Sequence, residues 1–183
     1  IKTGQPVPTP VTIEDVRKQA NEAYTQVDNL GVTVKPLSAL GVVDKIKKGL
    51  DEFNFNPELD NHKPIEILLK QFERQIGQQR VKFATIEQMR QAANQMKTSK
   101  DPVTKLLAGS VVNSMDIAMS KLKPTDVITG KQNVGEALKT LSTARNKWKV
   151  ASRAQILEDV LDVADAKALD PKASESELIR RGF

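Results

Sequence analysis

The chain of 183 residues contains no cysteine and a single histidine, His62. The absence of cysteine excludes structural disulfides and zinc sites built from thiolates. General acid–base catalysis and metal binding both rely heavily on histidine, and a lone histidine in a loop beside Pro64 is more typical of a turn or a helix cap. No phosphate-binding glycine loop, HExxH motif or GxSxG motif occurs. We therefore predict no catalytic site, no cofactor site and no metal site, and we predict that the chain is not an enzyme.

Aromatic residues and long apolar runs are also scarce. Aromatic side chains make up 4% of the residues and hydrophobic residues 39%, so the core must be built mainly from aliphatic side chains, which suits helix packing better than sheet packing. No apolar run approaches the length of about 18 residues that a membrane-spanning helix needs. The net charge of +5, from 28 basic and 23 acidic side chains, is mild. It indicates a solvated surface rather than the clustered basic footprint of a strong nucleic-acid binder.

Apolar residues recur at helical spacing through most of the chain, and no stretch alternates apolar and polar residues as a strand would. The sequence therefore predicts an all-α fold, an irregular bundle or array of about six to seven helices with one long helix in the C-terminal half. Residues 32–36 are expected to be an extended connector, and the phenylalanines of the loop 53–61 to plug a helix junction. The helix expected over residues 37–50 has an apolar stripe of Leu37, Leu40, Val43, Ile46 and Leu50, and the helix that begins near Pro64 has one of Ile65, Leu68, Leu69, Phe72 and Ile76. Helix-start signals are Thr12 with Asp15, Pro64, Thr85 with Gln88, Asp101 with Pro102, and Ser174 with Glu177.

Three regions are expected along the chain. Residues 1–11 contain three prolines and predict an extended arm or linker. Residues 12–130 hold several short helices. Residues 131–183 hold the long helix and the start of a further helix, packed with the preceding region. The chain begins at Ile1 without a methionine and ends as a new helical pattern develops, so we interpret it as a fragment of a longer polypeptide.

The predicted long helix, residues 133–167, carries the candidate contact residues. Its stripe is expected to include Leu141, Val150, Ala151 and Ile156 around the only tryptophan, Trp148, and to continue through Val160 and Val163. Arg145 lies three residues before Trp148 and shares its face. Trp148 is either a core anchor, which we favour, or an interface anchor. The candidate residues for contact with a partner or with DNA are Arg145, Lys147, Trp148, Lys149 and Arg153.

Charge is polarised along the same helix, with basic residues in its first half and acidic residues in its second half. This order opposes the preference of the helix macrodipole, and it reflects either neutral drift or matching to a partner. In the preceding helix, Asp116 falls beside the apolar stripe, and we expect it to make a structural hydrogen bond to a neighbouring helix end rather than to act in catalysis.

Several short motifs, in their order along the chain, resemble large virion proteins of tailed bacteriophages and prophages, of the DNA-ejection or internal virion protein type. The resemblance covers most of the chain from Val16 to Phe183, and Arg153 departs from it where lysine is expected. The motifs are Tyr24-x-x-Val27-Asp28, Gly31-Val32-x-Val34-x-Pro36, Phe55-x-Pro57-x-Leu59-x-x-His62-x-x-Ile65, Thr85-Ile86-x-x-Met89-Arg90, Asp116, Ala144-Arg145-x-x-Trp148-Lys149 with Arg153, Ile156, Ala164, Ala166 and Ala168, and finally Leu178, Arg180, Arg181 and Phe183.

The resemblance implies a structural role in particle assembly and in genome delivery into the host. It implies a protein made in the bacterial cytoplasm and located in the virion, with portal or tail components, and copies of itself, as partners. Weak DNA contact is compatible with it. Two alternatives stay open. One is a helical nucleic-acid-binding module that uses the basic half of the long helix, and the other is a regulatory domain of an enzyme whose catalytic part lies outside the fragment.

Overall fold

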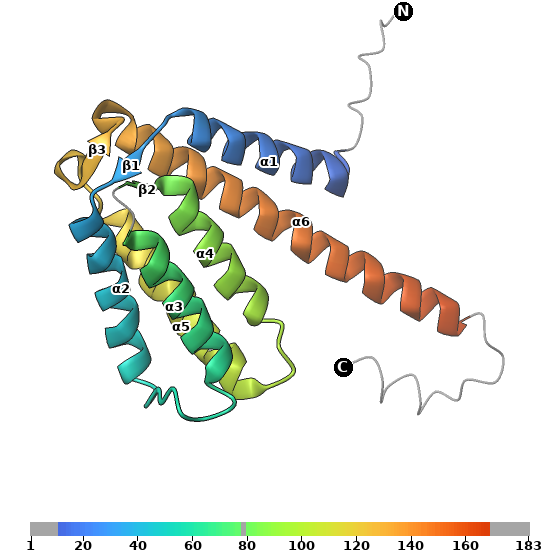
Figure 1. The fold of residues 1–183 in the computed structure, drawn as a ribbon. Helices are drawn as coiled ribbons and strands as arrows, with labels where there is room; N and C mark the ends of the chain where they lie inside the picture. The colour runs from blue at the N-terminus through green and yellow to red at the C-terminus, as the bar shows by residue number, and fades with distance from the viewer. Residues whose placement is uncertain (1–10, 78–79, 169–183) are drawn as a thin grey trace, which may run out of the picture. The chain divides into compact units, whose positions relative to one another are not determined.

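The computed structural model describes residues 11–77 and 80–168. Within these ranges the chain is mostly helical, which confirms the predicted all-α class (Figure 1). The long helix is confirmed as well, and its observed bounds agree with the prediction to within one residue. Residues 1–10 of the arm expected at residues 1–11, and the helix expected from Ser174, lie outside the described residues. The helices are α1 (Ile13–Asn29), α2 (Pro36–Asp51), α3 (Lys63–Ile76), α4 (Phe83–Met96), α5 (Pro102–Ser120) and α6 (Val134–Ala168), with short 3-10 turns at Pro124–Asp126 and Lys131–Asn133.

The chain divides into two compact units. The smaller unit combines Ile1–Tyr24 with Ser142–Phe183, and the larger unit is Thr25–Leu141. Helices α1 and α6 each contribute residues to both units. The structure thus groups the residues differently from the predicted regions 12–130 and 131–183.

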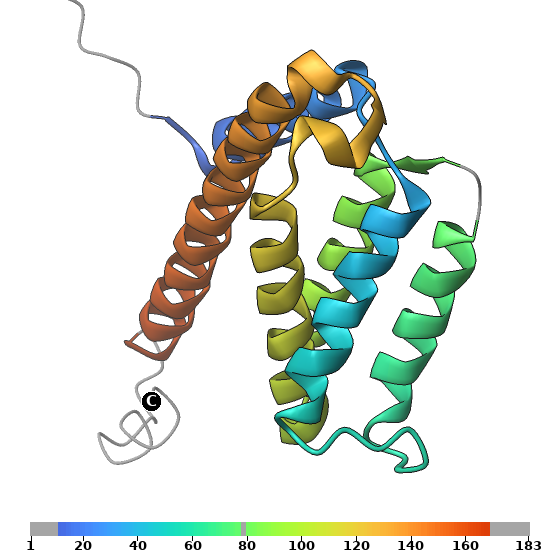
Figure 2. The same ribbon diagram turned by 90° about the vertical axis from the view of Figure 1, so that its left-hand side faces the viewer.

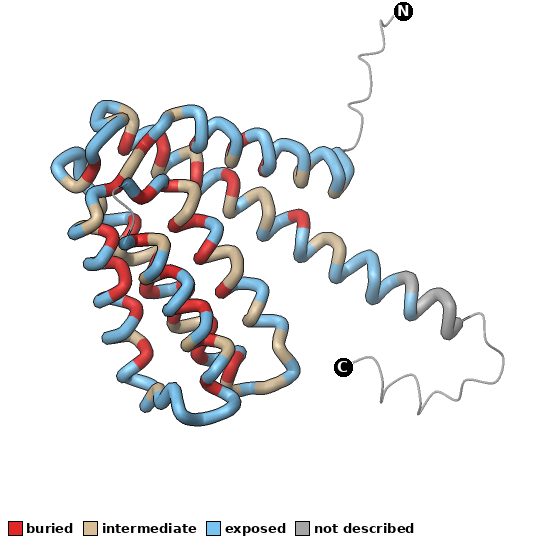
Figure 3. The backbone as a smooth tube through the Cα atoms, viewed as in Figure 1, coloured by how far each residue is buried: buried red, intermediate tan, exposed pale blue. Residues whose placement is uncertain are grey.

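In the larger unit, helices α2 to α5 form a bundle in which α5 packs on α2, α3 and α4 (Figure 2). Buried residues on these helices face the middle of the bundle (Figure 3). The five apolar residues predicted to form the stripe of α3 are all buried. The core is largely aliphatic, as the composition predicted, and the largest fully buried side chains include Phe72, Phe83, Ile46, Leu50, Ile65, Leu107 and Met115.

A small antiparallel sheet lies at one end of the bundle, where loops were expected (Figure 1). Its strands are β1 (Thr33–Val34), β2 (Val81–Lys82) and β3 (Val127–Thr129), in the order β2-β1-β3. Strand β1 falls within the predicted extended connector. Strands of two or three residues are too short to display an alternating pattern, so the sequence carried no signal for the sheet.

Two of the predicted helix starts are confirmed by their hydrogen bonds. In α1, the backbone N–H of Asp15 donates to Thr12 Oγ1 at 3.1 Å, and the N–H of Thr12 donates to Asp15 Oδ2 at 3.0 Å, which is a reciprocal capping box. In α5, Asp101 Oδ2 accepts the N–H of Thr104 at 2.7 Å. The start predicted at Thr85 is wrong because α4 begins at Phe83, directly after β2.

The predicted buried face of α2 is partly wrong. Leu37 and Leu40 were expected to face the core, but they are 82% and 46% exposed. Helix α2 carries two overlapping apolar stripes, and its packing against α5 selects the other one, which consists of Ala39, Val42, Val43, Ile46 and Leu50. Phe53, expected to plug a helix junction, is also exposed, whereas Phe55 is half-buried and stacks on His62.

Candidate functional site

The candidate contact residues lie on the part of α6 that belongs to the smaller unit, where α1 runs beside it (Figure 1). Arg17 Nη2 of α1 donates a hydrogen bond to Gln155 Oε1 of α6 at 3.2 Å. Lys147 Nζ of α6 donates to Gln19 Oε1 of α1 at 2.6 Å. The residue numbers of the partners on α6 decrease as those on α1 increase, so the two helix segments pair in antiparallel orientation.

Small side chains lie along the buried sides of this helix pair. Ala20 and Ala23 are buried on α1, and Ala144 and Ala151 are buried on α6. Alanine lets two helix backbones approach closely, and longer side chains then close over the contact. This arrangement suits Arg17 and the two glutamines, whose side chains bridge the helices.

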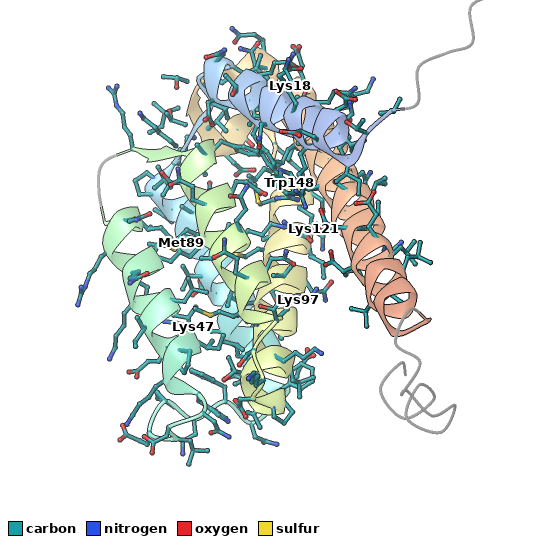
Figure 4. The ribbon with its side chains drawn as sticks, turned by 90° about the vertical axis from the view of Figure 1, so that its right-hand side faces the viewer. Lys18, Lys47, Met89, Lys97, Lys121 and Trp148 are labelled. Carbon is teal, nitrogen blue, oxygen red and sulfur yellow. The ribbon has the colours of Figure 1, made fainter. Side chains whose placement is uncertain are left out.

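Trp148 is half-buried and lies near α1 (Figure 4). The guanidinium carbon of Arg17 lies 6.0 Å from the centre of the tryptophan ring, a cation–π contact at the outer limit of its range. The Nε atom of Arg17 is buried and has no hydrogen-bond partner among the described residues, as expected for a guanidinium held against an aromatic face. Trp148 therefore anchors the α1–α6 pair with one side, and its other side reaches the surface.

The candidate contact residues do not form one surface patch. Lys147 is half-buried and bonded to α1, and Arg145 is half-buried on the face of Trp148. Lys149 and Arg153 are exposed, one helical turn apart. Sequence reasoning missed Arg17, Gln19 and Gln155, because the pairing of α1 with α6 joins residues more than 120 positions apart and leaves no local signal.

The second half of α6 departs most from the prediction. Ile156, Val160 and Val163 were assigned to the same stripe as Trp148, but these three residues are 61%, 54% and 52% exposed. Val150, expected to share in the burial, is exposed too. At 3.6 residues per turn, the buried face of the first half and the apolar face of the second half lie roughly 140° apart around the helix. The large aliphatic residues exposed on the second half are Ile156, Leu157, Val160, Leu161 and Val163, and we call them the outer apolar face.

Acidic residues lie on the side of α6 away from the outer apolar face. Glu158 and Asp159 are exposed, and the Nε2 group of Gln155 donates a hydrogen bond to Asp159 Oδ1 at 3.0 Å. Helical spacing places these two carboxylates about 100° apart on the side of α6 that points away from the centre of the outer apolar face. The basic residues Lys149 and Arg153 lie on the same side of the helix as the face, towards its N-terminal end.

The only histidine lies in a structural cluster between α3 and α5. His62 is buried, its Nδ1 atom accepts the N–H of Asn56 at 2.9 Å, and it occupies the residue before α3. The Thr104 hydroxyl lies within hydrogen-bond distance of Asp101 Oδ2, at 2.5 Å, and of the carbonyl of Asn61. The side-chain and backbone hydrogen bonds from Thr104 hold the pKa of Asp101 below its ordinary value. These bonds close a loop and cap α5, as predicted for a turn or capping histidine, and none of them pairs a nucleophile with a base.

Asp116 has a structural role, but its partner differs from the one expected. Arg90 of α4 donates to both carboxylate oxygens of Asp116, from Nε at 2.5 Å and from Nη2 at 3.1 Å. Arg90 Nη1 also lies 3.6 Å from the buried carboxylate of Glu87. The partner is thus a charged side chain within α4 rather than a helix end. A buried carboxylate needs such a counter-charge, and no pattern in the sequence marked Glu87 as buried.

Other kinds of site find no support in the part of the chain that the structure describes. Residues 11–77 and 80–168 contain no group of three acidic, histidine or cysteine side chains that could hold a metal ion. None of the helices in these ranges is long and apolar enough to cross a membrane. Comparison of the chain with protein-family models, with curated proteins and with solved structures finds no match. Function must therefore be inferred from the residues and from their arrangement.

Proposed function

We propose that this chain is a structural segment of a tailed-phage virion protein and that it acts in particle assembly and in genome delivery into the host. Two observations support the proposal. The ordered motifs between Val16 and Phe183 resemble internal virion proteins. The outer apolar face of α6 provides a surface suited to assembly. Portal or tail components and further copies of the chain are the proposed partners.

The outer apolar face is the main structural support for this role. Scattered single exposed apolar residues are ordinary, but a contiguous apolar patch rimmed by polar residues is typical of a protein–protein contact. Leu157 and Leu161 are 64% and 62% exposed and lie one turn apart on the same helix. Aliphatic side chains at this spacing are what a partner helix would cover. A scaffold role uses this feature directly.

The proposal predicts that the polypeptide is present in mature particles. An antibody raised against the purified chain should detect it in phage particles purified from the bacterium that carries the gene. If the protein takes part in delivery, the signal should leave the particle when ejection is triggered in vitro. Detection only in the host cell and never in particles would refute the virion assignment.

The proposal also predicts that the chain is not catalytic. The buried polar clusters around His62 and Asp116 use their side chains in hydrogen bonds and ion pairs that hold helices and loops. The purified chain should therefore neither clear peptidoglycan nor hydrolyse nucleotides. Turnover at enzymatic rates in either assay would refute this part of the proposal.

A helical nucleic-acid-binding module is the second candidate, and one observation favours it. Lys149 and Arg153 are both exposed and one turn apart, so both could contact phosphates. Three of the five candidate residues are half-buried, which leaves a small basic surface. We therefore expect only weak DNA binding that disappears near physiological salt.

Salt-dependent binding distinguishes the two functions. If α6 contacts phosphates, replacing Lys149 and Arg153 by glutamine should make the affinity less dependent on salt, because the variant neutralises fewer phosphates. The same change at Lys45 and Lys48, two exposed lysines of α2, is the matched control because it alters net charge equally. Tight, salt-resistant binding that depends on Lys149 and Arg153 would favour the nucleic-acid function.

A further inference from the structure

We infer that the end of the bundle that carries the small sheet is a contact surface for the phosphate backbone of nucleic acid. The inference deepens the proposed function and rests on it for the choice of partner, because packaged DNA is the polyanion that a virion protein meets. It concerns residues of the larger unit and not the basic half of α6. The purified chain suffices to test it.

Basic residues collect in the three connecting segments that meet at the sheet (Figure 1). Residues 30–35, 77–82 and 121–133 supply one strand each, β1, β2 and β3. Their described residues include one acidic residue, Asp126. They also include six basic residues, all exposed, which we call the basic end: Lys35, Arg80, Lys82, Lys121, Lys123 and Lys131. These segments lie far apart in the sequence, so the mild net charge of the chain did not indicate the concentration.

The two ends of the bundle differ in charge. At the end opposite the sheet, the connecting segments 52–62 and 97–101 carry four acidic and two basic residues: Glu52, Glu58, Asp60, Asp101, Lys97 and Lys100. The helix turns next to the sheet add Asp28, Glu73, Arg74 and Glu136, and Glu73 is paired with Lys47 at 2.7 Å. The sheet end therefore keeps a basic excess, which attracts anions.

Three residues of the basic end share the outer side of the sheet. Val34 of β1 and Val81 of β2 are paired and buried, so the residues next to them in each strand face outward. Lys82 is paired with Thr33, and the same register places Arg80 opposite Lys35. The backbone positions of Arg80 and Lys82 are about 7 Å apart along β2, and that of Lys35 is about 5 Å to the side.

This grouping of charge is unfavourable for the sheet itself. Like charges on opposed residues of neighbouring strands are destabilising. No salt bridge among the described residues offsets the charge of Lys35, Arg80 or Lys82. The carboxylate of Asp126 accepts the backbone N–H of Lys123 at 2.8 Å and the hydroxyl of Ser38 at 3.2 Å. Proteins break such local rules mainly at functional sites, and an anionic partner accounts for the grouping.

Protection of a sheet edge explains only part of the basic end. Basic residues on an edge strand hinder edge-to-edge association, and this reason suits Arg80 and Lys82, which adjoin or belong to β2. Lys35 adjoins β1, however, which is the central strand. Lys121 and Lys123 lie outside the strands.

The outer side of the sheet suits a nucleic-acid backbone. Duplex DNA presents a phosphate about every 3.4 Å along each strand, so several phosphates can lie over the basic end at once. The outward residues of the strands and their ends include no aromatic side chain for base stacking. They are Thr33, Lys35, Arg80, Lys82 and Thr129. The contact should therefore depend on the backbone and not on the base sequence.

An anionic bilayer is the competing partner, because Leu37 and Ile128 are exposed nearby. Membrane-surface sites combine their cations with a continuous apolar face. The outward residues listed for the strands are all polar or basic, so the sheet lacks such a face. Nucleic acid is the partner that these residues favour.

Fluorescence anisotropy of a labelled, mixed-sequence DNA duplex, titrated with the full chain at a series of low salt concentrations, tests the inference. The combined variant Lys35→Gln, Arg80→Gln and Lys82→Gln should bind more weakly. If each residue contacts one phosphate, the slope of log K against log salt should fall by about 2.7, because each contact contributes about 0.9. Over a fourfold rise in salt, the unmodified chain should then lose about 40-fold more affinity than the variant.

Two controls accompany this variant. Lys45→Gln, Lys48→Gln and Lys105→Gln combined removes the same charge from exposed lysines outside the basic end and should leave the slope nearly unchanged. Lys149→Gln with Arg153→Gln should do the same. The melting temperature of the basic-end variant should not fall, because the substitutions remove a repulsion. A fall would show that the three side chains stabilise the sheet, which contradicts the argument.

Three further results would overturn the inference. The first is an unmodified chain that does not bind the duplex even at the lowest salt. The second is a basic-end variant that binds like either control variant. The third is binding to vesicles containing phosphatidylglycerol without binding to the duplex at the same salt. Each of these leaves the detection of the protein in particles unaffected, so failure here and failure of the virion assignment are distinguishable.

Discussion

Helices α2 and α5 approach each other closely at Gly49, and a methyl group at this position provides a sharp test of the packing. A Cβ atom on Gly49 would lie 2.3 Å from Ser114 Oγ and 3.1 Å from Ser110 Oγ. Ser114 is buried, and Ser110 Oγ donates a hydrogen bond to the carbonyl of Gly49 at 2.8 Å. The glycine thus allows α5 to come close enough for its serines to contact the backbone of α2.

Two opposing effects determine how much Gly49→Ala should change the free energy of unfolding. Forcing an extra carbon into a packed core costs about 1–3 kcal/mol. Replacing glycine by alanine within a helix returns about 0.5–1 kcal/mol. We therefore expect Gly49→Ala to lower the free energy of unfolding by about 1–2 kcal/mol, because the overpacking term exceeds the helix-propensity term. In a chain of this size that is a fall in melting temperature of about 2–8 °C.

Gly41 supplies the matched control in the same helix. A Cβ atom at Gly41 would meet no atom within 4 Å, so Gly41→Ala should gain about 0.5–1 kcal/mol from helix propensity alone. Combining Gly49→Ala with Ser114→Ala removes the oxygen at 2.3 Å and should restore much of the stability. The single variant Ser114→Ala is also measured, so that the three variants form a double-mutant cycle. If the clash is relieved, the double variant should be more stable than the sum of the two single effects predicts.

Urea unfolding followed by circular dichroism compares the unmodified chain with the four variants. The midpoint should shift while the slope stays constant, because the area exposed on unfolding is unchanged. If Gly49→Ala is as stabilising as Gly41→Ala, the close approach of α2 and α5 is refuted. If Ser114→Ala fails to relieve the destabilisation, the assignment of the clash to Ser114 is wrong.

Three further predictions test the charged and aromatic contacts. Arg90→Met removes the guanidinium beside the buried carboxylate of Glu87 and should cost about 3 kcal/mol in urea unfolding; a loss below about 1 kcal/mol would contradict the buried ion pair. The lowered pKa of Asp101 means that its carboxylate stabilises the fold above the ordinary aspartate value of 3.8, and this contribution is lost as pH falls through the folded pKa. Asp101→Asn keeps the helix cap but does not titrate, so its melting temperature should fall less than that of the unmodified chain between about pH 5 and pH 2; parallel curves would contradict this. Trp148→Ala should cost about 2 kcal/mol, roughly half the loss for a fully buried tryptophan, and Arg17→Ala should increase acrylamide quenching of Trp148 fluorescence; unchanged quenching would refute the cation–π contact.

Local features of the chain could be predicted because their physical causes are local. The cap at Asp101 depends on hydrogen bonds to residues two and three positions away. The stripe of α3 is the only apolar stripe on its helix, so its burial followed from spacing alone. The extent of α6 followed from an uninterrupted helical pattern. The all-α class followed from the same periodicity along the chain.

Tertiary structure decided the features that depend on distant partners. Helix α2 offers two apolar stripes, and only the contact with α5 selects the one that leaves Leu37 exposed. The strands are too short to carry a pattern, and they pair only because three distant segments meet. Along α6, a single apolar stripe was predicted from Trp148 to Val163. In the structure, α1 packs against one side of the helix and does not cover the outer apolar face. The position of α1 therefore decides which apolar residues of α6 are buried and which are exposed. Periodicity reveals that a helix has an apolar face, whereas burial of that face requires a second surface, and the chain's folded arrangement determines where that surface lies.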